Sequence, residues 1–233
     1  MQKEKKKLCA SDASLQYIDS EVKKPVIKSG NYKGRIAVTG FGPAGLFCAL
    51  VLSENGYRPI VFERGETVDD RARSVERFWN GGPLNISSNV QFGEGGAGTF
   101  SDGKLTTRIK DPFCRYVLES FVKFGAPEEI LFRAKPHIGT DKLKSIIKRM
   151  REQIMENGGE VHFNTTVTGF ETDGSRICRV KTDKGDHDAA AVVMAVGNSA
   201  RDTFEMLFFK QHSYADQAVF SRCPHRASSG ERK

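Results

Sequence analysis

One short segment constrains the fold of this chain more than any other, the glycine-rich turn GFGPAG at residues 40–45. A short apolar run at 35–39 precedes the turn, and an apolar helix is predicted over 43–55, where Gly56 ends it. Residues 57–62 then predict a second buried strand. Strand, tight turn, helix and strand in this order form one βαβ unit of about 30 residues.

Each glycine of the turn has its own part in binding a dinucleotide. Gly40 permits a tight turn, Gly42 lets the backbone approach a pyrophosphate, and Gly45 lets the helix pack against the strands. The helix that begins with Pro43 and Ala44 offers the free N–H groups of its first turn, from Ala44 on, and a partial positive charge to phosphates. These features predict a dinucleotide-binding turn, and a merely structural turn is the alternative.

Two charged residues follow the second strand. Glu63 stands 23 residues after Gly40, where a carboxylate can accept hydrogen bonds from the ribose hydroxyls of adenosine. Arg64 could contact a phosphate, as in an NADP site, but a solvated side chain is the favoured interpretation. Because strand, turn, helix, strand and acid occur in the expected order, dinucleotide binding is favoured.

A second glycine-rich segment lies within residues 81–104, which show almost no helix or strand pattern. Four glycines within six residues permit close backbone approach and give successive N–H groups that can face an anion. Phe92, Phe100 and Leu105 would be badly placed in a flexible surface loop, the alternative, so a ligand-facing loop is favoured. Its candidate binding residues are Gly95, Gly96, Ala97, Gly98, Thr99, Ser101 and Asp102.

The rest of the chain predicts helices followed by short strands. Helices are expected at 67–80, at 111–124 and from 140 to about 157. The last carries an apolar stripe of Leu143, Ile146, Ile147, Met150 and Ile154. Strands are expected at 160–164, 167–172, 176–182 and 187–191, with a fully buried strand at 192–196. Trp79 is expected to pack its helix onto the sheet. The predicted fold class is α/β, a doubly wound Rossmann-like domain with a small antiparallel β-meander.

The net charge of +7 is concentrated at the two ends of the chain. Residues 1–35 hold nine Lys and Arg against four Asp and Glu, and residues 210–233 hold five against two. The body between them is close to neutral. A nucleic-acid-binding protein would more often carry a basic stripe on its body, so no nucleic-acid partner is expected.

Cysteine usage and hydropathy indicate the compartment. The five cysteines are scattered and odd in number, which favours a reduced cytoplasmic protein over a disulfide framework. No apolar run approaches the roughly 20 residues of a membrane-spanning helix, so no membrane partner is expected. Cys223 and His225 are close in sequence, but two possible ligands do not make a zinc site, and no metal is expected.

The stretch from Arg35 to about Met206 resembles a family of uncharacterised FAD-dependent dehydrogenases, a branch of the glutathione-reductase-type FAD proteins. The segments that carry this resemblance are VTGFGPAGLFCALVLSENGYRPIVFERG, FWNGGPLN, SNVQFGEGGAGTFSDGKL, GAPEEIL, KPHIGTDKL, GGEVHFNTTV and VGNSARDTFEML. They occur in order and cover about three-quarters of the chain.

The resemblance implies FAD as the bound nucleotide and NAD(P)H as a possible electron donor. The residues implied to line the FAD are Gly40, Gly42, Pro43, Ala44, Gly45, Glu63, Val167, Ala195 and Gly197. The second glycine-rich segment would lie toward the flavin. Hydride transfer would occur at the flavin ring, so no catalytic residue is assigned. His137 is a candidate proton donor, although a hydrogen-bonded loop histidine is the commoner explanation.

The resemblance also predicts the domain organisation. A basic polar tail is expected at 1–33, an FAD-binding domain at 34–209 and a divergent basic tail at 210–233. Family members continue with a substrate-facing segment and a second FAD motif, which the last residues do not match, so a truncated or frame-shifted reading frame is expected. The alternatives are a nucleotide-binding fragment without turnover, an NAD(P)-binding Rossmann protein, and nucleic-acid binding through the basic tails. The substrate, a small molecule, and the oligomeric state are not predicted.

Overall fold

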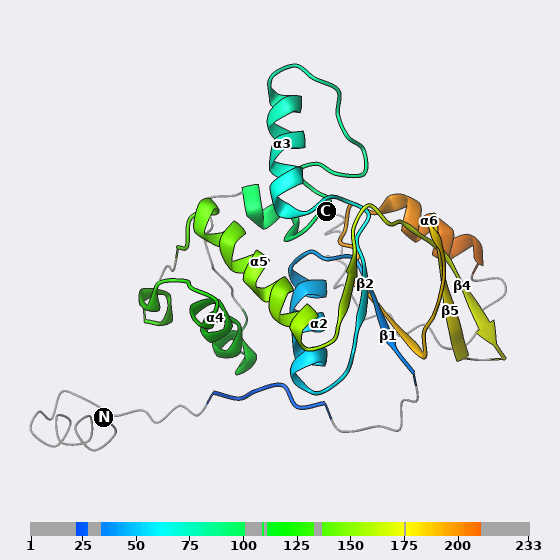
Figure 1. Cartoon of the computed structure of the whole chain (residues 1–233), viewed down its shortest axis with the longest axis horizontal. Helices are drawn as coiled ribbons and strands as arrows, with labels where there is room; N and C mark the ends of the chain where they lie inside the picture. Colours follow the sequence, from blue (N-terminus) through cyan, green and yellow to red (C-terminus); the bar gives the residue numbers. More distant parts are fainter. Residues whose placement is uncertain are drawn as a thin grey trace, which may run out of the picture.

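A four-stranded parallel sheet lies at the centre of the molecule (Figure 1). The computed structural model describes residues 22–27, 34–100, 109, 111–132, 137–174 and 176–210. In the sheet, β1 pairs in parallel with β2 on one side and β7 on the other, and β2 pairs in parallel with β3. The strands are β1 (Ile36–Thr39), β2 (Ile60–Phe62), β3 (Glu160–His162) and β7 (Ala191–Met194). This is the predicted α/β class with its opening βαβ unit.

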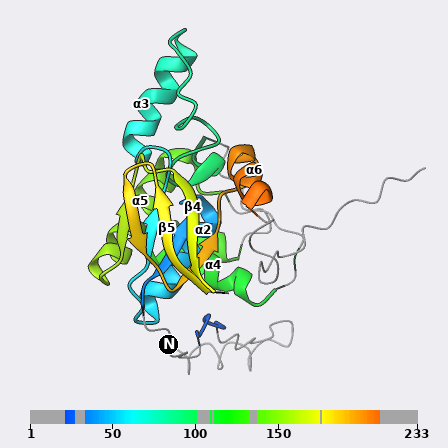
Figure 2. The same cartoon turned by 90° about the vertical axis from the view of Figure 1, so that its right-hand side faces the viewer.

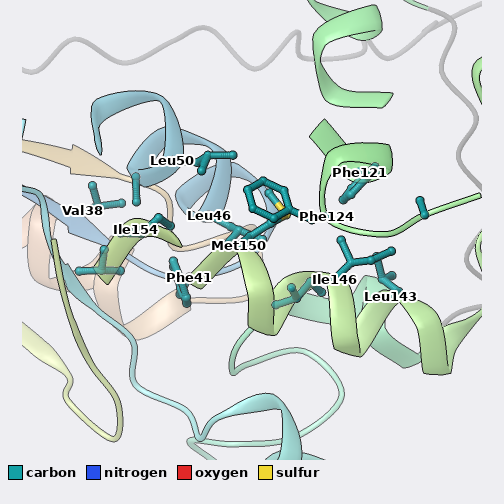
Figure 3. Packing of buried hydrophobic residues seen from close by; sticks show 14 of the residues in the cluster. Val38, Phe41, Leu46, Leu50, Phe121, Phe124, Leu143, Ile146, Met150 and Ile154 are labelled. Carbon is teal, nitrogen blue, oxygen red and sulfur yellow. The ribbon is translucent and has the colours of Figure 1, made fainter. Parts of the chain in front are cut away.

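Helices cover one face of the parallel sheet, and α4 packs beside α2 (Figure 1). Val38 and Val61 belong to the same hydrophobic cluster as Leu46 and Leu50 of α2, and Figure 3 shows Val38 on the same side of the sheet as the α2 side chains. The predicted apolar stripe of α5 is buried in the same cluster, which confirms its helical spacing. The helices are α2 (Pro43–Glu54), α4 (Phe113–Lys123) and α5 (Thr140–Glu156).

Gly56 ends α2 as predicted, because it adopts a left-handed conformation with φ +81°. Its N–H donates to the carbonyl of Ser53 (3.1 Å), and the N–H of Tyr57 donates to that of Leu52 (3.0 Å). This pair of bonds is a Schellman motif, which satisfies carbonyls at the helix end. The chain then turns back toward the sheet to form β2.

A small antiparallel sheet and helix α6 cover the other face (Figures 1 and 2). Alternation along the strands sends Ala37 and Phe62 toward this side, where they pack with Val167, Phe170 and Val180. The sheet has the order β4-β5-β6, so the predicted meander is confirmed. Its strands are β4 (Val167–Asp173), β5 (Arg176–Thr182) and β6 (Gly185–Asp188), and α6 spans Arg201–Lys210.

Two strand predictions need correction. The run predicted as one strand at 187–191 is divided, because β6 ends at Asp188 and the chain crosses to the parallel sheet. At the crossing, Ala189 donates its N–H to Cys178 and Ala190 donates to Arg35. The strand predicted as fully buried is half-buried instead, since β7 has β1 as its one strand partner within the described residues.

Helix α3 (Val68–Trp79) projects away from the rest of the molecule (Figures 1 and 2). Its outer end is therefore exposed, and 65% of the surface of Trp79 is accessible to solvent. The prediction that Trp79 packs its helix onto the sheet is wrong. Trp79 contacts Phe100 edge to face, and α3 is buried only at its base, where Val68, Arg71 and Val75 lie.

Candidate nucleotide-binding site

The carboxyl ends of the four parallel strands meet at one edge of the sheet. At this edge the chain passes from β1 into Gly40, from β2 into Glu63, from β3 into Phe163 and from β7 into Ala195. Since β2 and β7 flank β1, helix α2 begins where the order of the strands reverses. Ligands of open α/β sheets bind in the crevice at such a point.

Backbone contact fixes the glycine turn in place. Gly40 has φ +94° and donates its N–H to the carbonyl of Phe62 (2.8 Å). A Cβ atom on Gly40 would lie 2.5 Å from the carbonyl oxygen of Ala195. A Cβ on Gly45 would lie 1.9 Å from the carbonyl oxygen of Gly40. Side chains are therefore excluded at both positions by the close approach of β1, α2 and the segment after β7.

Gly42 differs from these two glycines. Its φ of −69° suits any residue, and a Cβ there would meet only the Cα of Gly96, 3.9 Å away, among the described residues. Gly42 is the N-cap of α2, and no described side chain caps the helix. Pro43 has no N–H, and the N–H groups of Ala44 and Gly45 have no acceptor within the helix. The turn therefore presents donors and a positive helix end to an anion, with room for close approach.

Glu63 is buried beside the turn, with only 4% of its surface exposed. Its Oε2 accepts the N–H of Phe41 (2.6 Å), and its Oε1 accepts the N–H groups of Gly65 (2.8 Å) and Gly93 (3.1 Å). Each carboxylate oxygen accepts about two hydrogen bonds, so Oε2 retains one acceptor position. Glu63 thus joins the first glycine turn to the second glycine-rich segment, which the sequence did not reveal.

Arg64 is not solvated, which corrects the favoured interpretation. Its guanidinium forms an ion pair with Asp202 (2.9 Å) and donates to the hydroxyl of Thr203 (2.9 Å), both at the start of α6. It also lies over the ring of Phe92, 4.8 Å from the centroid. Residues 64 and 202 are far apart in the sequence, so this partner could not be predicted from local spacing.

The second glycine-rich segment packs against the first. Gly95 donates its N–H to the carbonyl of Phe41 (2.9 Å), and a Cβ on Gly96 would lie 2.9 Å from Cδ of Pro43. The segment continues as the short 3-10 helix η1 (Gly96–Phe100), in which Ala97 is exposed. The structure therefore brings together two glycine segments more than fifty residues apart.

The remaining predicted site residues fall into three groups. Thr99 is buried, and its hydroxyl donates to the carbonyl of Gly96 (2.9 Å) within the loop. Gly98 lies in η1 and is half-buried. Ser101 and Asp102 lie outside the described residues.

The segments after β3 and β7 also reach the edge where the turn lies. Ala195 donates its N–H to the carbonyl of Thr39 (2.8 Å), and Gly197 follows it with φ +76°. Thr165 donates its N–H to the backbone carbonyl of Glu63 (2.9 Å), so the segment that leads into β4 at Val167 passes beside the end of β2.

His137, the candidate proton donor, is exposed beside the start of α5.

Arg71 is the main site residue that sequence reasoning missed. It lies in a charged helix, yet the structure buries it completely at the base of α3, against the second glycine segment. Burial lowers the pKa of Arg71 to about 10, and the carboxylates of Glu63 and Glu94 oppose that change. The guanidinium is charged at neutral pH. One signal was available, because Arg71 shares a helical face with Val68 and Val75.

Glu94 is a second buried charge under the same segment. It has no exposed surface, and its Oε2 accepts from the N–H of Val68 (2.7 Å) and from the guanidinium of Arg151 (2.8 Å). Its Oε1 has no hydrogen-bond partner in the described part of the chain. Burial raises the pKa of Glu94, while the charge of Arg151 lowers it. A buried carboxyl oxygen without a hydrogen bond costs stability.

The described residues contain no group of three or more His, Cys, Asp or Glu side chains that could hold a metal ion. No described helix has the length and apolar character needed to cross a bilayer. Cys223 and His225 lie outside the described residues.

The chain is similar in sequence to a curated protein of unknown role. No family model matches the chain. An uncharacterised protein of Clostridium beijerinckii is 52% identical to it over 184 residues. The match covers 78% of this chain and 34% of that protein, so the chain spans about one third of the length of its relative.

Solved structures show weaker similarity. THI4 of Thermovibrio ammonificans is 18% identical with a TM-score of 0.45, and the match covers 72% of this chain and 58% of THI4. L-Proline dehydrogenase of P. horikoshii is 20% identical with a TM-score of 0.42, and the match covers 76% of this chain and 56% of the dehydrogenase. Similarities of this size do not assign a function.

Proposed function

We propose that this chain binds FAD at the glycine turn and forms the FAD-binding part of an oxidoreductase. The observation that carries the proposal is the environment of Gly42. Packing among the described residues does not require glycine there, yet the position stands at an uncapped helix end where strand order reverses. A glycine that the protein itself does not need is explained by a ligand whose pyrophosphate lies against the backbone.

The residues around the turn fit such a nucleotide. The N–H groups of Ala44 and Gly45 would hold the pyrophosphate, and the second glycine segment would cover it from the side of Gly96. The remaining acceptor position on Oε2 of Glu63 suits one ribose hydroxyl. The backbone at Val167 would lie near the adenine, and Ala195 and Gly197 would lie along the nucleotide, as the sequence resemblance implies.

The state of Arg64 bears on which nucleotide binds. An NADP site needs a cation that is available to the 2′-phosphate of the ribose. Arg64 is instead neutralised by Asp202 and covers Phe92. This favours a nucleotide with a free 2′-hydroxyl, and the choice of FAD over NAD rests on the family resemblance of the sequence.

Bound FAD would supply hydride transfer at its flavin ring. The residues described here would bind and orient the nucleotide, and none of them is assigned a proton-transfer role. In this proposal NAD(P)H is the electron donor and the substrate is a small molecule. The chain spans about one third of the length of its relative, and none of the residues described here is assigned to the substrate.

The visible absorption spectrum of the purified full chain tests the proposal, recorded before and after addition of FAD and removal of the excess. We expect flavin bands that stay with the protein. A folded protein that retains no FAD but binds NADH would contradict the proposal. Retained flavin that neither NADH nor NADPH reduces would support FAD binding and contradict the oxidoreductase activity of this chain.

A further inference from the structure

Arg71 is a fully buried arginine whose guanidinium hydrogen bonds all go to one segment. Its Nε donates to the carbonyl of Asn89 (2.7 Å), and its Nη2 donates to that of Val90 (2.9 Å). Its Nη1 contacts three acceptors, the carbonyls of Glu94 (2.7 Å) and Gly96 (2.9 Å) and the hydroxyl of Thr99 (2.9 Å). One side chain on α3 thus contacts the segment at five points.

The segment that Arg71 contacts is costly to order. Glycine loses more conformational freedom on folding than any other residue, and four glycines lie between residues 93 and 98. The stem of Arg71 packs directly on this run, since a Cβ on Gly93 would lie 2.5 Å from its Cδ. The ring of Phe100 closes the other side, 4.8 Å from the guanidinium. Arg71 therefore supplies the packing that the glycines lack.

The same segment forms one wall of the proposed nucleotide site. Gly95 is hydrogen-bonded to Phe41, and Gly96 packs on Gly42 and Pro43. Any displacement of the segment would move this wall away from the start of α2. The contacts therefore run in an unbroken chain from Arg71 through the segment to the turn.

We infer that Arg71 is the positioning residue of the nucleotide site, holding the segment from Gly93 to Thr99 against the N-terminus of α2 in the binding geometry. The expected change in FAD affinity rests on the proposed function. The ordering of the segment by Arg71 can be measured without a nucleotide. Arg71 does not touch the reacting atoms and is not a catalytic residue.

Lysine is the informative replacement at this position. An ammonium keeps the charge but has a single nitrogen, so it cannot reach acceptors that are spread from Asn89 to Thr99. Arg73 on the same helix provides the matched control, since 71% of its side chain is exposed and it pairs only with Asp70 among the described residues. Both variants replace a guanidinium with an ammonium, at a buried position in Arg71→Lys and at an exposed position in Arg73→Lys.

The experiment measures amide hydrogen exchange of the full chain without FAD, then FAD binding by titration well below the unfolding temperature. In Arg71→Lys we expect amides of residues 93–99 to exchange at least tenfold faster while those of β1 and α2 keep their rates. We expect the FAD dissociation constant to rise on the order of tenfold, as for the loss of one or two buried hydrogen bonds. Arg73→Lys should change neither quantity.

Each of the other possible results would overturn one part of the inference. Unchanged exchange at residues 93–99 in Arg71→Lys overturns the positioning role, whatever FAD does. Faster exchange with an unchanged FAD dissociation constant overturns the link to the nucleotide site. A wild-type chain that binds no FAD contradicts the proposed function, while the exchange rates still decide whether Arg71 orders the segment. If Arg71→Lys does not fold, Thr99→Val removes one of the five contacts, and the same two measurements decide on that variant.

Discussion

The two glycine-rich segments of this protein are ordered in different ways. The turn at residues 40–45 is held by backbone packing, since Gly40 and Gly45 approach Ala195 and each other too closely for any side chain. The segment at 93–98 is enclosed mainly by side-chain atoms, among them those of Arg71, which also donates hydrogen bonds to it from a different helix. Backbone atoms thus fix the first segment, and side chains of other elements fix the second.

This difference has a consequence for mutation. A turn fixed by steric exclusion should fail when any side chain is added at its contact points. A segment fixed by hydrogen bonds from a buried charge should fail when that charge or its neighbours change. The two segments meet at Gly42 and Gly96, so both kinds of change should reach the same binding site.

The largest effect is expected from Gly45→Ala. The added methyl would lie 1.9 Å from the carbonyl oxygen of Gly40, and a backbone atom cannot move aside as a flexible side chain can. We expect the free energy of unfolding to fall by about 3 kcal/mol, the upper end of overpacking costs. Urea unfolding followed by circular dichroism measures this change, and a loss below about 1 kcal/mol would contradict the steric account.

Gly42→Ala separates binding from folding. The methyl fits, because its nearest neighbour is 3.9 Å away, so stability should change by no more than about 1 kcal/mol for loss of an N-cap glycine. The methyl would occupy the space proposed for the pyrophosphate, and we expect the FAD dissociation constant to rise at least on the order of tenfold. Fluorescence titration with FAD measures the constant. An unchanged constant would mean that the nucleotide does not approach this glycine.

A pH effect on stability should distinguish the second segment, which packs on buried charged side chains, from the turn, whose own residues are uncharged. Burial raises the pKa of Glu94 above its usual 4.5, so the folded state binds a proton more tightly than the unfolded state. The resulting stabilisation is fully present below pH 4.5 and is lost as the pH rises through the folded pKa. The Glu94→Gln variant has no carboxyl at this position, so it lacks this pH-dependent contribution to stability.

We therefore expect the stability of Glu94→Gln relative to wild type to improve as the pH rises from 4.5 to 8. Urea unfolding of both proteins at several pH values measures this trend. A difference that is independent of pH would show that Glu94 does not titrate with a raised pKa. Glu76→Gln, at an exposed position of α3, is the matched control.

The smallest effect is expected from Gly98→Ala. No atom of the described residues lies within 4 Å of the added methyl, and the backbone there has no positive φ. We expect a change of less than about 0.5 kcal/mol in the free energy of unfolding, as for a surface substitution. A thermal melt beside that of Gly45→Ala makes the comparison within one experiment. A large loss would contradict the open space around Gly98.

Much of the fold was predictable, because its signals are local. The glycine turn, the Schellman end of α2 at Gly56 and the apolar stripe of α5 each lie within one element or one turn. The meander was predictable from alternation and turn residues. The burial of a strand at the edge of the sheet was not predictable. The strand β7 was therefore expected to be fully buried, although β1 is its one strand partner in the described part of the chain.

The site was predictable only in part, because its supports come from distant segments. Spacing indicated Glu63 and the turn, but not that Glu63 also accepts the N–H of Gly93. Arg64 was interpreted as solvated and Arg71 was not singled out, and tertiary packing gives both of them partners distant in the sequence. The roles of these residues toward a nucleotide stay predictions.

A crystal structure of the full chain grown with FAD would test the central claim most directly. We predict pyrophosphate density within hydrogen-bond distance of the N–H groups of Ala44 and Gly45, with Gly42 and Gly96 on either side of it. Density for the nucleotide at another place, or crystals with an empty turn in saturating FAD, would contradict the claim that the two glycine segments form one nucleotide site.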